Sequence, residues 1–101
     1  MSRYYDRRGN PVADVITWAR TFEEADRHVG DTTIGDVRVS TVWLGVDHNF
    51  GSGPPLLFET MVFGGKLDEE QERYSTEAEA EAGHARWVKL ARALQGAPGS
   101  R

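Results

Sequence analysis

The stretch 39-VSTVWLGVDHNFGSGPPLLFETMVFGG-65 contains two apolar runs, and a polar, glycine-rich loop of residues 47–55 joins them. Side chains alternate between the two faces of a strand, so Val39, Thr41 and Trp43 share one face of the first run. The second run alternates in the same way. The stretch therefore predicts two strands connected by a long hairpin loop.

Further strands are predicted on both sides of this pair. Residues 28–34 and 37–44 are rich in β-branched side chains and are separated by a two-residue Gly-Asp turn, which is typical of a β-hairpin. A double glycine ends the later apolar run, and an acidic turn at residues 68–70 precedes a short edge strand at residues 72–74. We therefore expect an antiparallel sheet of about four strands.

Two helices are predicted to flank the sheet. A short helix over residues 14–26 has Asp14 in position to cap its first turn. The apolar residues expected to face the core are Val15, Trp18, Ala19, Phe22 and Ala25. A long helix is predicted from residue 76 to about residue 95, because Thr76 and Glu79 have the spacing of a capping box. Its apolar stripe contains Ala80, Gly83, His84, Trp87, Ala91 and Leu94.

These elements predict an α+β fold in the order α-β-β-β-β-α, with the long C-terminal helix packed on one face of the sheet. A chain of 101 residues is long enough for one core and too short for a second. We expect one globular domain over residues 1–95. Residues 96–101 have no periodicity and are expected to form a flexible tail.

The composition argues against several classes of function. The chain has no cysteine, which excludes disulfides and thiolate sites. Its net charge of -4 disfavours non-specific binding to nucleic acid, because that affinity depends on Lys and Arg. No apolar run approaches the ~18 residues of a membrane span, and the N-terminus lacks the pattern of a signal peptide. We expect a cytoplasmic protein that does not contact a membrane and uses no cofactor.

The loop of residues 47–55 is the best candidate site, since loops on a rigid sheet often carry function. Phe50 either anchors a protein interface or folds back over the open end of the sheet. In the first case Asp47, His48 and Asn49 would supply polar specificity. The candidate binding residues are Asp47, His48, Asn49, Phe50, Gly51 and Gly53.

A second hypothesis is an acid-base or metal site, because carboxylate and imidazole are common ligands of zinc and manganese. Asp47 and His48 would need further groups from Glu59, His84 or His28. The metal-site alternative consists of His48, Glu59 and His84, and it requires these groups to converge in one pocket. His84 lies in the apolar stripe of its helix, where a histidine is usually a core residue with one hydrogen-bond partner. If Glu59 is that partner, the titration of the two groups would be strongly coupled.

Ordinary loop geometry explains the same residues without a ligand. Asp47 and Asn49 commonly accept backbone N–H groups in tight loops, and glycines supply positive φ angles. A third hypothesis has residues 51–53 form a backbone nest for a nucleotide phosphate beside Arg38 or Arg73. The chain has neither a phosphate-loop motif nor the elbow motif of a serine hydrolase.

Several phrases of the sequence resemble a pattern in small uncharacterised proteins of actinobacterial bacteriophages and prophages. They are YYDR and GNP within residues 4–11, STVWLG and DHNFG within residues 40–51, FETMVFGG at residues 58–65, and RYST and GH within residues 73–84. The resemblance implies a context and no activity. That context is expression in the cytoplasm of a host cell, and an accessory role in binding a host or phage protein.

The leading hypothesis is therefore a non-enzymatic module that binds a host or phage protein through the loop of residues 47–55. The alternative is a small-molecule or metal-binding site, hydrolytic or nucleotide-sequestering. The oligomeric state is left open by the sequence.

Overall fold

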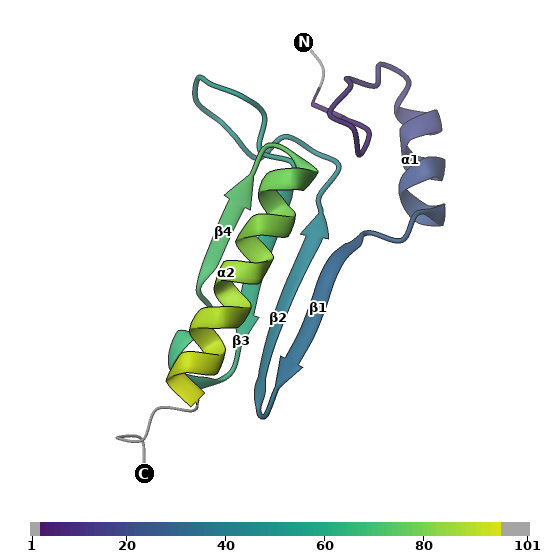
Figure 1. The fold of residues 1–101 in the computed structure, drawn as a ribbon. Coiled ribbons are helices and arrows are strands. Elements are labelled where there is room, and N and C mark those ends of the chain that lie inside the picture. The colour runs from purple at the N-terminus through teal and green to yellow at the C-terminus, as the bar shows by residue number, and fades with distance from the viewer. Residues whose placement is uncertain (1–2, 96–101) are drawn as a thin grey trace.

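The computed structural model describes residues 3–95, and in this part it contains four β-strands and two α-helices. Along the chain the elements are α1 (Val15–Glu24), β1 (His28–Ile34), β2 (Val37–Trp43), β3 (Phe58–Phe63), the 3-10 helix η1 (Gly65–Leu67), β4 (Gln71–Tyr74) and α2 (Glu77–Gln95). The strands pair antiparallel in the spatial order β1-β2-β3-β4, and α2 lies along one face of the sheet (Figure 1). The expected α+β fold is confirmed, whereas the predicted tail at residues 96–101 lies outside the described residues.

The central strands β2 and β3 supply the buried face of the sheet. Their register pairs Val39 with Val62, and Thr41 with Thr60, and all four side chains are fully buried. One apolar cluster contains Val37, Val39, Val62, Val88 and Ala91, and a second contains Trp43, Leu57, Phe58, Tyr74 and Ala80. Because the threonine pair lies between these clusters along the strands, the middle of the buried face is polar.

α2 begins with the capping box that the sequence predicts. The Thr76 hydroxyl accepts the N–H of Glu79 at 3.1 Å, and the Glu79 carboxylate accepts the N–H of Thr76 at 3.1 Å. The buried residues of the helix are Ala80, Gly83, Val88 and Ala91. The predicted stripe is therefore confirmed in part, with Trp87 half-buried at its edge. Neither helix within residues 3–95 combines the length and the apolar composition that a membrane crossing requires.

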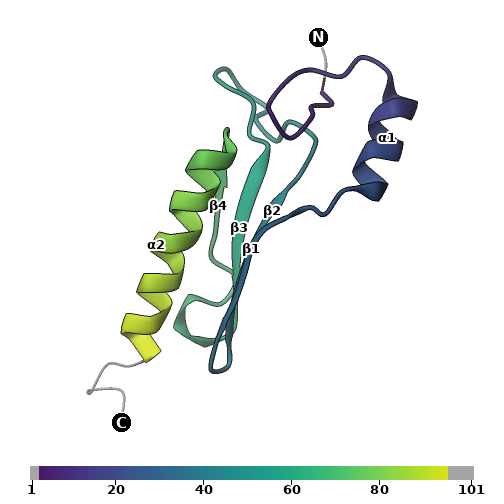
Figure 2. The same ribbon diagram turned by 45° about the vertical axis from the view of Figure 1, so that its right-hand side comes forward.

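α1 lies away from α2, near the end of the sheet where β1 begins (Figure 2). A row of aromatic rings attaches it there. The ring centroids of Tyr4, Trp18, Phe22 and Trp43 follow one another at 4.7, 4.9 and 5.2 Å. The indole N–H of Trp18 also donates to the carbonyl of Gly45 at 3.0 Å. These contacts connect the helix to the last residue of β2 and to the segment that follows it.

The predicted core face of α1 is only partly correct. Asp14 caps the helix, since its carboxylate accepts the N–H of Ile16 at 3.0 Å. Trp18 and Phe22 are half-buried, but Val15 is 46% exposed and does not face the core. The reason is that α1 contacts the body through one aromatic row and none of its residues is fully buried.

Gly83 allows α2 to lie close to β4. A Cβ atom at this position would overlap the ring and hydroxyl of Tyr74, the buried last residue of β4. The φ angle of Gly83 is not positive. Glycine is therefore required for space and not for backbone conformation.

We predict that Gly83→Ala destabilises the protein, although alanine is the better helix former. Helix propensity alone would stabilise by ~1 kcal/mol, whereas overpacking a core costs ~1–3 kcal/mol. Because the added Cβ would overlap the Tyr74 ring, we expect the upper part of this cost, ~2–3 kcal/mol. The net loss in the free energy of unfolding is then about 1–2 kcal/mol, measured by urea denaturation. Ala85→Gly, at an exposed position of the same helix, isolates the propensity effect. A Gly83→Ala variant as stable as the wild type would contradict the close approach.

Candidate functional site

The loop of residues 47–55 lies at the end of the sheet where β2 ends (Figure 1). The N-terminal segment pairs with the base of this loop. The N–H of Tyr5 donates to the carbonyl of Gly45 at 2.9 Å. The N–H of Asp47 donates to the carbonyl of Arg3 at 2.9 Å. The start of the chain therefore supports the loop, a pairing between distant residues that the sequence pattern does not indicate.

Asp47 and Asn49 hold the loop in its conformation. The Asp47 carboxylate accepts the N–H groups of Asn49 at 2.7 Å and Leu56 at 2.9 Å, which closes the base of the loop. The Asn49 amide spans the tip, since its Oδ1 accepts the N–H of Gly51 at 3.0 Å and its Nδ2 donates to the carbonyl of Pro54 at 2.9 Å. The interpretation of these two residues as loop-stabilising is confirmed, because both side chains bind the backbone of their own loop.

His48 uses one ring nitrogen within the loop. Its Nδ1 lies 2.8 Å from the carbonyl of Val46, and because a carbonyl can only accept, Nδ1 carries the proton. In the neutral ring Nε2 is then an acceptor, and it has no hydrogen-bond partner within residues 3–95. His48 and Phe50 are neighbours, with ring centroids 6.4 Å apart. An unused acceptor therefore lies beside the aromatic ring.

Phe50 is 81% exposed, the largest exposed fraction among the large apolar residues that the structure describes. The alternative in which its ring folds back over the sheet is therefore wrong. The guanidinium carbon of Arg3 lies 5.9 Å from the centre of the ring, within the range of a cation–π contact. We refer to Arg3, His48 and Phe50 as the loop patch.

The geometry gives the anion-binding hypothesis little support. The N–H of Gly51 already donates within the loop, and of the two loop glycines only Gly53 has a positive φ angle, at 110°. Arg38 and Arg73, which would flank a phosphate, each pair with a carboxylate of a neighbouring strand, at 2.9 and 3.0 Å. Both the backbone donor and the cations are thus engaged.

The metal-site alternative is not assembled in residues 3–95. Glu59 alternates with the buried Thr60 along β3, so it lies on the sheet face opposite α2, whereas His84 lies on α2 itself. Glu59 pairs with Arg73 at 3.0 Å, so the Glu59–His84 pair that the sequence left open does not form. His48 remains in the loop. In the described part of the chain, no three His, Cys, Asp or Glu side chains form a group that could hold a metal ion.

His84 instead belongs to a chain of hydrogen bonds that crosses the sheet beneath α2, which we call the buried chain. Its contacts are Thr32 to His84 Nε2 at 2.9 Å, His84 Nδ1 to Thr41 at 2.7 Å, Thr41 to Thr60 at 2.6 Å, Thr60 to Tyr74 at 2.9 Å and Tyr74 to Glu72 at 3.1 Å. The Glu72 carboxylate also accepts N–H groups from Trp87 at 2.9 Å and Arg86 at 3.3 Å. The buried chain therefore connects all four strands to the helix.

The carboxylate of Glu72 sets the direction of the buried chain. The Tyr74 hydroxyl contacts both Thr60 and Glu72 but has only one proton to donate. Because a carboxylate can only accept, Tyr74 donates its hydrogen bond to Glu72. Thr60 must then donate to Tyr74, and Thr41 to Thr60. By the same reasoning, Nδ1 of neutral His84 donates a hydrogen bond to the Thr41 hydroxyl. Its Nε2 accepts a hydrogen bond from the hydroxyl of Thr32 in β1.

Burial perturbs the titration of two members of the buried chain. It lowers the pKa of His84 from its ordinary value, while nearby Asp31 acts in the opposite sense. Burial also raises the pKa of Tyr74, and the adjacent Glu72 carboxylate acts in the same direction. In the folded protein near pH 7 both groups are therefore neutral, as the direction of the hydrogen bonds requires.

Comparison of the chain with protein-family models, with curated proteins and with solved structures finds no match. The functional argument therefore depends on the geometry of the loop patch. The sequence alone did not predict Arg3 as a residue of the loop patch. Arg3 lies near Phe50 because its carbonyl pairs with the N–H of Asp47, which is distant in the sequence. The arginine-rich start of the chain was the one signal for it.

We predict that Asp47→Ala destabilises the protein by about 1–3 kcal/mol, because two backbone N–H groups lose their acceptor. Asp47→Asn keeps an oxygen acceptor and should cost less. The free energy of unfolding is measured by urea denaturation, and the amide exchange of Asn49 and Leu56 should accelerate. Asp36→Ala, in the exposed turn between β1 and β2, is the control. Equal effects of Asp47→Ala and Asp36→Ala would show that the carboxylate does not hold the loop.

We predict that acidification destabilises the wild type more than a His84→Gln variant. The unfolded chain protonates this histidine near pH 6.5, whereas the pKa of folded His84 is lower, so the unfolded state binds more protons below that pH. Stability is thus lost as the pH falls from about 6.5 toward the lowered pKa. Urea denaturation of both proteins between about pH 7.5 and about pH 5.5 measures the difference in their free energies of unfolding, and contributions common to both proteins cancel.

The same histidine offers a spectroscopic check on the direction of the buried chain. Nitrogen-15 NMR of the imidazole at neutral pH should detect the Nδ1–H tautomer of His84. An Nε2–H tautomer, or equal pH dependence of the wild type and His84→Gln, would contradict the arrangement.

Proposed function

We propose that this protein is a non-enzymatic protein-binding module that acts through the loop patch. The observation that supports the proposal is the 81% exposure of Phe50 on a loop whose backbone is held by its own side chains. A large aromatic ring exposed in this way loses apolar contact with water when a partner covers it. Aromatic anchors of this kind carry a large share of binding energy at protein interfaces.

The rigidity of the loop matters as much as the exposure of the ring. Binding normally requires loops and side chains to lose conformational freedom, which costs ~0.5–1.5 kcal/mol for each immobilised side chain. Here Asp47 and Asn49 already restrict the loop before any partner arrives. Their role in the proposal is to hold the loop, since their polar atoms are engaged within it.

Polar specificity comes instead from the neighbours of Phe50. The Nε2 atom of His48 is an acceptor without a partner within residues 3–95, and the exposed guanidinium of Arg3 is a donor beside the ring. The partner surface that fits this arrangement has an apolar pocket for the ring, with a hydrogen-bond donor and a carboxylate or carbonyl at its rim.

The class of partner follows from the resemblance to small phage and prophage proteins. Such a protein is expressed in the cytoplasm of an actinobacterial host and binds a host or phage protein there. The protein would then act as an accessory factor that redirects its partner, with no chemistry of its own.

The experiment is affinity capture from an actinobacterial host lysate, followed by binding measurements with the purified partner. We predict that Phe50→Ala raises the dissociation constant by roughly 10- to 30-fold. An anchor residue contributes ~2 kcal/mol to binding, and each ~1.4 kcal/mol changes the dissociation constant tenfold. Phe63→Ala is the matched control, because Phe63 is also exposed, at 42%, but lies on the sheet face opposite α2.

Circular dichroism and urea denaturation establish that both variants are folded, so that a loss of binding reports the surface and not the fold. The dissociation constant of Phe63→Ala should stay within about twofold of the wild-type value. Equal affinities for the wild type and Phe50→Ala would remove the loop patch from the interface. Failure to capture any partner would count against the proposed binding role.

A further inference from the structure

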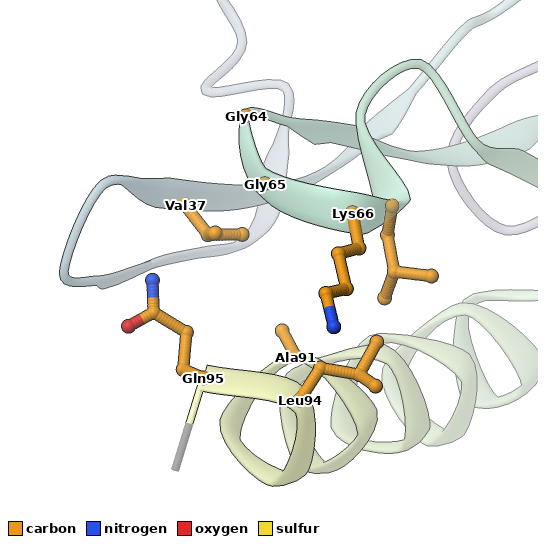
Figure 3. Close-up of a pocket in the computed structure, with 8 residues that line it drawn as sticks. Val37, Gly64, Gly65, Lys66, Ala91, Leu94 and Gln95 are labelled. Carbon is orange, nitrogen blue, oxygen red and sulfur yellow. The ribbon is translucent and has the colours of Figure 1, made fainter. Parts of the chain in front are cut away.

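A cavity of about 170 Å³ lies between η1 and the last turns of α2 (Figure 3). It adjoins Val37, the first residue of β2, so it lies at the opposite end of the sheet from the loop patch. The surface of the cavity is almost entirely apolar. Its lining consists of Val37, Leu67, Ala91 and Leu94, the backbone of Gly64 and Gly65, and the side chains of Lys66 and Gln95.

The double glycine that ends β3 shapes one wall of this cavity. Gly64 and Gly65 both have positive φ angles, of 89° and 69°. A Cβ atom at Gly64 would lie 2.5 Å from the carbonyl oxygen of Asp36, and one at Gly65 would lie 2.8 Å from Cγ2 of Val37. Because no side chain fits on either residue, the chain turns against β2 with bare backbone. The wall is therefore formed by the turn itself.

Among the described residues that line the cavity, Lys66 is the one that carries a charge. Figure 3 shows its side chain reaching from η1 toward Ala91 and Leu94. It has no salt bridge or hydrogen bond from its amine within residues 3–95. No salt bridge joins it to Asp68, whose carboxylate accepts the N–H of Gly64 at 2.7 Å. An unpaired ammonium group thus lies beside an apolar space.

We propose that this cavity binds a small apolar monocarboxylate. The hydrocarbon part would occupy the space between η1 and α2, and the carboxylate would pair with the ammonium of Lys66. The size is suitable, because an apolar protein cavity of about 150 Å³ accommodates a benzene ring. The charge is complementary, since Lys66 is the one cation among the described lining residues and has no anionic partner within residues 3–95. This site is separate from the loop patch and does not depend on the proposed protein-binding role.

The experiment compares two probes of nearly the same shape, phenylacetate and its neutral amide, phenylacetamide. Methyl NMR spectra of the wild type are recorded during titration with each probe at constant ionic strength. We expect phenylacetate to shift the methyl signals of Val37, Leu67 and Leu94, and to leave those of Val29 and Val46 at the other end of the sheet unchanged. The melting temperature should rise by several degrees at ten times the dissociation constant.

Two substitutions separate the charge from the cavity. Lys66→Met keeps an apolar side chain of similar length and should weaken phenylacetate binding at least fivefold. Lys89→Met, at an exposed position of α2 away from the cavity, is the control and should change it by less than twofold. Ala91→Leu should fill the space and abolish binding, and the wild-type titration supports or overturns the proposal even where this variant fails to fold.

Several outcomes would overturn the proposal. Unshifted methyl signals at 10 mM phenylacetate would show that the cavity does not take this class of ligand. Equal affinities for the acid and the amide, or for the wild type and Lys66→Met, would show that the site does not select a carboxylate. Nuclear Overhauser contacts between residues beyond Gln95 and the methyl groups of Leu67 and Leu94 in the free protein would also overturn it. They would show that the protein's own C-terminal residues occupy the cavity.

Discussion

The fold depends on the complete satisfaction of the hydrogen bonds in the buried chain. Thr41 and Thr60 are fully buried in the middle of the sheet, where an unpaired hydroxyl would cost ~1–3 kcal/mol. Each is satisfied because His84 reaches down from α2 on one side and Tyr74 closes the chain on the other. These contacts set the position of the helix along the sheet. The two apolar clusters on either side then pack at the distances that this position allows.

The sheet and α2 were predictable because their signals are local. Strand alternation, the Gly-Asp turn and the Thr76–Glu79 capping box depend on neighbours in the sequence, and all of them appear in the structure. The partner of His84 was not predictable in the same way. Strand alternation predicts that Glu59 and Thr60 lie on opposite faces of the sheet. It does not predict which face α2 covers, because that depends on packing between distant segments. The prediction that Val15 faces the core was wrong for the same reason. Helical spacing does not indicate how closely α1 packs against the rest of the protein.

The loop illustrates the same division between local and distant interactions. The roles of Asp47 and Asn49 follow from the known tendency of these residue types to bind nearby backbone groups. The direction of the Phe50 ring does not follow, because residues 47–55 have no periodicity that relates a side chain to a face. Residues 3–5 contribute to the site through pairing that spans about forty positions of sequence, which no local pattern reports.

The N-terminal segment and α1 also differ from the rest of the molecule in how firmly they are attached. They join the body through the aromatic row, the backbone pairing near Gly45 and the contacts of Arg7 with Glu77, and α1 has no fully buried residue. Segments with few buried apolar contacts open locally at a lower free energy than the core unfolds. Local opening of this segment would remove the backbone support beneath the loop while the sheet and α2 stay intact. The segment with the fewest buried contacts is thus the one that supports the loop patch.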